Sequence, residues 1–282
     1  MTYVIDWAAQ AAAVPSEAGI DAAWNAAVAR EIGRTTDRFV VDAGCGSGGM
    51  ARALADALPE ARVVGVDASE HMLELAAARS AGYPRIEFVQ ASYEDGLADA
   101  VGQPADLVWA SASVHHAGDQ QAAVTRLAEL LAPGGRLALA EGGLPAYYLP
   151  WDVGVGEPGL EHRLVAAGQR WFERMRAALP GQVRMPYGWP EAMRRAGLAD
   201  GRTRTFLTEV PAPLPAEARE VVVHALTAQV ERLADTELLD EADRDTWRHL
   251  LDPDDAAWVG ARDDTYVLSA RSVHTGYRRS TT

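Results

Sequence analysis

The sequence predicts an α/β fold, a three-layer α/β/α sandwich around a mostly parallel sheet. Short apolar segments of strand character alternate along the chain with segments of helical character, as in parallel sheets with crossover helices. The clearest segment is 39–41, where Phe-Val-Val suits a strand buried on both faces. It leads into a glycine-rich turn at residues 44–49 and then into a predicted helix at about 47–58.

The composition limits the kind of protein. The 282 residues suffice for one large domain or a domain with a lid, and the single cysteine permits no internal disulfide. No apolar run approaches the roughly 20 residues of a membrane helix, and the N-terminus lacks the basic flank and apolar core of a secretion signal. We therefore expect a soluble, cytoplasmic protein with no membrane partner.

The charge excludes some functions. Asp and Glu number 40 against 26 Lys and Arg, giving a formal net charge of −14, and such a surface disfavours a nucleic-acid partner. The sequence contains no lysine, which excludes a Schiff-base lysine and a P-loop lysine. The sequence predicts no metal site and leaves the oligomeric state open.

Two ligand classes use a glycine turn of this kind. Gly44, Gly46 and Gly49 satisfy the dinucleotide pattern G-x-G-x-x-G, which keeps an NAD(P)-dependent oxidoreductase open as an alternative. Asp42 favours a different ligand, because an acid at the strand end repels a pyrophosphate and attracts an ammonium group. The run Asp-x-Gly-x-Gly-x-Gly from Asp42 to Gly48 resembles motif I of the class I S-adenosylmethionine (SAM) methyltransferases of the small-molecule type.

The resemblance covers residues 39–141 well and the remainder loosely. It implies a Rossmann-like α/β/α sandwich with seven strands in the order 3-2-1-4-5-7-6, the last strand of the chain antiparallel. It also implies SAM as cofactor and S-adenosylhomocysteine (SAH) as product, with Asp42, Gly44, Cys45 and Gly46 at the cofactor.

The next two predicted strands, 62–67 and 85–90, bring further candidate cofactor residues. Asp67 ends the first of them, where an acid can accept hydrogen bonds from ribose hydroxyls, which SAM and NAD share. Ala68 and Met72 would flank the adenosine, although Met72 is equally explained as a core residue. Ser92 stands where the family usually has an aspartate for adenine, and Tyr93 is an alternative that stacks on the ring.

The predicted strand 106–111 ends at Ser111, a candidate cofactor contact, and is followed by His115 and His116. Paired histidines here resemble enzymes that methylate quinones and sugars. A Pro-Gly-Gly turn at 133–135, also typical of the family, precedes the strand 136–141, which ends at Glu141. Neighbouring strand ends lie about 5 Å apart. We therefore predict His115 as a general base oriented by Glu141; the alternative is that both histidines only tie the loop to backbone carbonyls.

Helical segments outside this core suggest a cap. Residues 1–36 would form an N-terminal lid with helices at 7–13 and 20–32, the latter being equally explained by packing on the core. The SAM-binding core would span 37–141, a first cap insertion 142–186 and a second 212–262, all within one domain of 1–282. Between and after the insertions we expect a helix at 189–196 and strands at 202–210 and 265–272. Within the insertions we expect helices at 160–179, 217–233 and 238–251.

Aromatic residues are concentrated in these segments, which favours a small organic acceptor over a macromolecule. The candidates for acceptor contact are Tyr3, Trp7, Trp24, Tyr147, Trp151 and Trp171. The predicted function is SAM-dependent O-, N- or C-methylation of a small molecule, in specialised metabolism. A SAM-binding protein that catalyses another reaction is a third possibility.

Overall fold

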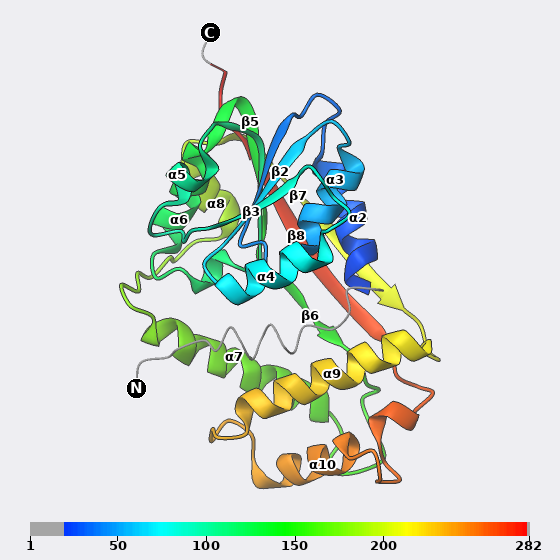
Figure 1. The fold of residues 1–282 in the computed structure, drawn as a ribbon. Helices are drawn as coiled ribbons and strands as arrows, with labels where there is room; N and C mark the ends of the chain where they lie inside the picture. Colours follow the sequence, from blue (N-terminus) through cyan, green and yellow to red (C-terminus); the bar gives the residue numbers. More distant parts are fainter. Residues whose placement is uncertain (1–19, 281–282) are drawn as a thin grey trace.

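The computed structural model describes residues 20–280, so the lid candidates Tyr3 and Trp7 lie outside the described residues (Figure 1). Eight strands of this part of the chain form one mixed sheet. They are β1 (Phe39–Ala43), β2 (Arg62–Asp67), β3 (Ile86–Gln90), β4 (Ala105–Ser111), β5 (Leu131–Ala140), β6 (Gly143–Tyr147), β7 (Ala199–Val210) and β8 (Val267–Tyr277).

The strand order confirms the predicted topology. Strands β3, β2, β1, β4 and β5 are neighbours in that order and parallel, while β8 is antiparallel to β5. β7 pairs with β8 along nearly its whole length, so it occupies the edge of β8 that β5 leaves open. These two strands are the predicted strands six and seven. The added strand, β6, pairs with β8 beyond the end of β5 and lies in the predicted cap insertion.

Helices cover both faces of the sheet, as the three-layer prediction requires. The longer elements are α2 (Ile20–Ile32), α3 (Gly49–Ala57), α4 (Glu70–Arg79), α5 (Leu97–Val101), α6 (Gln120–Glu129), α7 (Leu160–Ala178), α8 (Trp189–Arg195), α9 (Ala216–Leu233) and α10 (Glu241–Leu251), with short 3-10 turns at η1 (Val114–His116) and η2 (Val259–Ala261). Helices α2 and α3 bury their apolar residues on one face of the sheet, and α5, α6 and α8 do so on the other (Figure 1).

A separate core holds the cap together. Helices α7, α9 and α10 lie beyond one end of the sheet (Figure 1), and their buried residues form a third cluster that includes Leu164, Leu226 and Trp247. Trp247 and Leu226 are fully buried. Val267, at the start of β8, belongs to the same cluster, so this strand reaches from the cap into the sheet.

One local prediction needs correction. The Pro-Gly-Gly segment at 133–135, expected as a turn before a strand, lies inside β5. The pairing with β4 shifts register between Ala105 and Leu107, and Gly134 has a φ of +79°. Ala105 pairs with Leu131 and Leu107 with Arg136, so residues 132–135 have no partner in β4 and form an irregular excursion within the longer strand.

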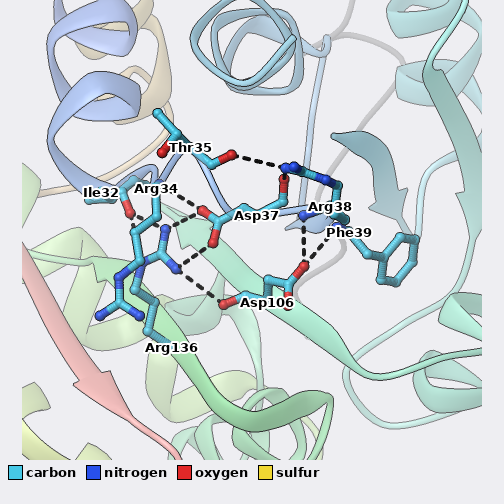
Figure 2. A network of polar contacts seen from close by, with 8 residues as sticks. All are labelled: Ile32, Arg34, Thr35, Asp37, Arg38, Phe39, Asp106 and Arg136. Atoms are coloured by element: carbon cyan, nitrogen blue, oxygen red, sulfur yellow. Dashed lines mark hydrogen bonds and ion pairs between the residues drawn. The ribbon is translucent and has the colours of Figure 1, made fainter. Parts of the chain in front are cut away.

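A buried ion-pair network fastens the amino ends of the central strands (Figure 2). The Arg136 guanidinium is 2% exposed and donates to the carboxylate of Asp37 and to the carbonyl of Ile32. The Asp106 carboxylate accepts from the backbone amides of Arg38, at 2.7 Å, and Phe39, at 3.0 Å. The segment that joins α2 to β1 is thus tied to β4 and β5.

No helix among residues 20–280 has the length and apolar character to cross a membrane.

Candidate functional site

The glycine turn at the end of β1 is tight on one side and open on the other. Gly44 has a φ of +72°, and a Cβ there would lie 2.5 Å from the Cβ of Ser113, so a larger residue does not fit. Gly46 has a φ of +51°, and a Cβ there would meet no described atom within 4 Å. The backbone amides of Gly44 and Cys45 donate to the Val66 carbonyl. The open side at Gly46 is where a ligand can approach the backbone.

A cavity of about 370 Å³ adjoins this turn. It is lined by several residues predicted from the sequence: the cofactor candidates Asp42, Gly44, Cys45, Gly46, Met72 and Ser111 and the acceptor candidate Trp24. Sequence reasoning missed other lining residues, among them Asn25, Met50, Trp109, Val221 and Arg271. Because Val221 belongs to α9, the cap contributes to the wall of the cavity.

Asp42 is the most unusual group in this cavity. Its side chain is 2% exposed, and its Oδ2 has no hydrogen-bond partner among the described residues. Burial, helped by the nearby negative charge of Asp67, raises the pKa of Asp42 to about 7, while a hydrogen bond from the Ala51 amide acts in the opposite direction. A buried carboxylate oxygen without a partner is costly unless a ligand supplies a donor.

Asp67 lies beside the turn, as predicted from its place at the end of β2. Its two carboxylate oxygens accept from the backbone amides of Gly46 and Ser69, both at 2.9 Å. A carboxylate has about four acceptor positions, so further hydrogen bonds remain possible. Of the two predicted adenosine neighbours, Met72 lines the cavity, whereas Ala68 is exposed and does not.

The two adenine candidates are engaged elsewhere. The Ser92 hydroxyl accepts from the backbone amides of Glu94 and Asp95. The Tyr93 hydroxyl lies 3.0 Å from the Ala43 carbonyl and 2.6 Å from the Ser113 hydroxyl, and burial raises its pKa. Neither residue lines the cavity at the glycine turn. Tyr93 supports the turn from behind, and its stacking on adenine stays a prediction.

The contact expected between His115 and Glu141 is present. His115 Nδ1 and Glu141 Oε2 are 2.8 Å apart, and Glu141 Oε1 accepts from the amides of Ser113 and Val114. Glu141 is 4% exposed, so this carboxylate is held firmly against η1. With a proton on Nδ1 shared with Glu141, the His115 Nε2 carries the free lone pair.

His116 differs from His115 in its environment. The two rings have centroids 4.1 Å apart. Burial, with a smaller contribution from the neighbouring His115, lowers the pKa of His116 to about 4. His116 is therefore neutral at pH 7 and a poor proton acceptor, which leaves His115 as the better candidate for a base.

Helix α7 of the cap grips the loop that carries His115. The Phe172 ring meets the His115 ring edge-on at 5.5 Å. The Arg176 guanidinium, one turn further along α7, donates to the carbonyls of His115, at 2.7 Å, and Ala117, at 2.5 Å. Sequence reasoning missed Arg176, because its partners lie some sixty positions earlier and share no local pattern with it.

The predicted acceptor residues separate into two groups. Trp24 lines the cavity, where it packs on Trp109 with ring centroids 5.9 Å apart. The other three described candidates lie in the cap. Tyr147 and Trp151, the latter 63% exposed, both pack against His162, and Trp171 lies under the Arg232 guanidinium. None of these three lines the cavity at the glycine turn, so their contact with an acceptor stays a prediction.

Comparisons with known proteins agree with this geometry. A family model described as a methyltransferase domain matches residues 40–135. The chain is 43% identical over 100 residues to a trans-aconitate 2-methyltransferase of Paracidovorax citrulli, covering 36% of this chain and 37% of that protein. It is 33% identical over 124 residues to a ubiquinone/menaquinone biosynthesis C-methyltransferase of Syntrophotalea carbinolica, covering 44% and 52%. The chain thus spans at most about half the length of these curated relatives.

Solved structures share the fold at low identity. The YcgJ protein of Bacillus subtilis superposes with a TM-score of 0.50 at 19% identity, over 92% of this chain and all of that one. A candidate methyltransferase of Bacillus halodurans gives a TM-score of 0.53 at 16% identity, over 93% of this chain and all of that one. The family match begins in β1 and ends in β5, so it contains the whole glycine turn, and the surrounding sheet has the strand order that the family resemblance implies. The match over residues 40–135 and the strand order of the sheet together support a class I SAM-dependent methyltransferase.

Proposed function

We propose that this protein methylates a small organic acceptor with SAM. The observation that carries the proposal is the buried, unpartnered Oδ2 of Asp42 beside the open side of the Gly46 turn. SAM supplies a methyl group on a sulfonium, which is already a good leaving group, so the protein's main task is alignment. Asp42 would hold the ammonium group of the ligand and Asp67 the ribose hydroxyls.

The same observation argues against a dinucleotide. A pyrophosphate at the glycine turn would bring negative charge close to the buried Asp42 carboxylate, which like-charge repulsion disfavours. A SAM-binding protein with another reaction stays an alternative, and the mass of the product separates it from a methyltransferase.

His115 and Glu141 define the chemistry that we propose for the acceptor. Their 2.8 Å contact orients the imidazole, and the free Nε2 can accept a proton from a hydroxyl, a phenol or an activated carbon. A carboxylate acceptor is already ionised at neutral pH and gains little from a base. The dyad thus favours an acceptor that must lose a proton, whereas the trans-aconitate relatives suggest a carboxylic acid. That the acceptor belongs to specialised metabolism stays a prediction.

Binding tests the proposed cofactor. Calorimetry should show that the protein binds SAH. NADH and NADPH should bind much more weakly or not at all. Asp67→Ala should weaken SAH binding by about 1–3 kcal/mol, the cost of losing hydrogen bonds to a charged group. Unchanged SAH affinity in a folded Asp67→Ala variant would remove Asp67 from the site.

Turnover tests the base and the acceptor class together. His115→Asn keeps a donor toward Glu141 and removes Nε2. With a hydroxyl, phenol or carbon-acid acceptor this variant should lose about 10²–10⁴-fold in turnover, the usual contribution of a general base, at nearly unchanged SAH affinity. With trans-aconitate as acceptor the loss should stay within a few-fold. His116→Asn is the matched control. A larger loss of turnover in His116→Asn than in His115→Asn would show that His116, and not His115, is the base.

A further inference from the structure

We propose that Arg271 is the anchor for the carboxylate at the amino-acid end of the cofactor. The inference rests on the proposed SAM site and concerns a residue of β8, far from the glycine motif in sequence. Arg271 lines the same cavity as Asp42 and Gly46. In the sheet Arg271 lies opposite Gly143 of β6 and Phe206 of β7. Along β8 it precedes the residues that pair with β5, which begin at His274.

The charges of the cavity point to this role. Its described lining contains two acids, Asp21 and Asp42, and Arg271 is the one cation among those residues. The amino-acid end of SAM or SAH carries an ammonium and a carboxylate side by side. Asp42 matches the ammonium, so the carboxylate requires a donor from another part of the wall. A guanidinium offers five N–H donors in a geometry suited to a carboxylate.

A second donor lies beside the first. The Trp24 indole N–H is buried and has no partner among residues 20–280, although the residue lines the cavity. The Arg271 guanidinium stacks on the Trp24 ring at 3.8 Å from its centroid. This stacking orients the guanidinium before any ligand arrives. The Arg271 guanidinium and the Trp24 indole N–H are thus two neighbouring hydrogen-bond donors in the cavity wall, and the indole N–H has no partner among the described residues. A ligand carboxylate requires donors of this kind.

The present partner of Arg271 can be exchanged at low cost. The guanidinium pairs with the Asp21 carboxylate at 2.7 Å, but the Asp21 side chain is 68% exposed and that of Arg271 34%. Exposed pairs of this kind contribute little to stability, because water and salt screen both charges. A ligand carboxylate inside the cavity can therefore replace Asp21 as the partner of the guanidinium, or share the guanidinium with Asp21, without a large penalty.

A ligand that lacks the carboxylate tests the anchor directly. S-Adenosyl-3-thiopropylamine is SAH without its carboxylate, and calorimetry compares it with SAH on the wild type, Arg271→Gln and the control Asp21→Asn. We expect the wild type to favour SAH by about 10–100-fold, in line with hydrogen bonds to a charged group. Arg271→Gln should lose most of this preference by weakening SAH alone, and Asp21→Asn should keep it. Arg271→Lys, which retains the charge, should keep part of it.

The outcomes separate the anchor from the proposed function. If Arg271→Gln weakens both ligands equally, or neither, the anchor is wrong while SAH binding by the wild type still supports the function. The same judgement applies to Arg271→Lys if the glutamine variant does not fold. If the wild type binds SAH and its decarboxylated form equally, Arg271 does not hold the carboxylate. Absence of SAH binding to the wild type would overturn the proposed function and the anchor together.

Discussion

Asp42 combines a carboxylate with full burial, and its protonation should therefore be linked to ligand binding. In the free site burial and Asp67 raise the pKa of Asp42 to about 7. A bound ammonium group favours the ionised form and must lower that pKa. Binding should then release a proton at pH 6–7, and SAH affinity should rise with pH up to about 7 and level off above it.

Calorimetry in buffers of different ionisation enthalpy measures this proton release. Asp42→Asn should show none and should bind SAH more weakly at pH 8. Stability should change in the opposite sense. Because the folded pKa lies above the unfolded value of 3.8, Asp42 favours the folded state at low pH, and that contribution is lost as the pH rises through about 7. A pH-independent SAH affinity in the wild type would contradict the raised pKa.

At the scale of elements, helix α7 contacts the loop that carries His115, the proposed base, through Arg176. Arg176 should act as a positioning residue, since its guanidinium holds the carbonyls of His115 and Ala117. Arg176→Met should lower kcat about 10-fold, the value of one or two hydrogen bonds. SAH affinity should change little, and Arg176→Lys should recover part of kcat.

Steady-state kinetics checks the positioning role of Arg176, because kcat and KM are measured separately for each variant. Arg174→Met is the matched control, because Arg174 is an exposed residue of the same helix. If both variants behave alike, or if Arg176→Met only lowers the melting temperature, then Arg176 has a purely structural role.

The elements that were predicted well have local signals. β1 to β5 follow from apolar runs, their order follows from the family resemblance that the glycine motif carries, and the His115–Glu141 contact follows from adjacent strand ends. β6 was missed because its five residues contain a proline and no alternation, and its partner strand lies more than a hundred positions later. Arg176 and Arg271 were missed for the same reason: their roles depend on partners that only the folded chain brings near.

At the scale of the whole molecule, two of the three apolar cores meet at the cavity. The two sheet faces and the cap each have their own cluster. The cavity lies where the α2 side of the sheet meets the cap, because its lining includes Trp24 of α2 and Val221 of α9. The buried Arg136–Asp37 pair fastens the amino ends of the strands, so the carboxyl ends that form the site are built on a fixed base.

The length of β8 has a consequence for how the protein unfolds. This strand begins in the cap core at Val267 and continues into the sheet core at Val273, paired with β7 along the way. Cap and sheet should therefore melt as one cooperative unit and not as two domains. Leu226→Ala, in the cap, should cost about 2–5 kcal/mol. It should lower the melting temperature seen by far-ultraviolet circular dichroism and by tryptophan fluorescence equally, whereas two separated transitions would show that the cap melts on its own.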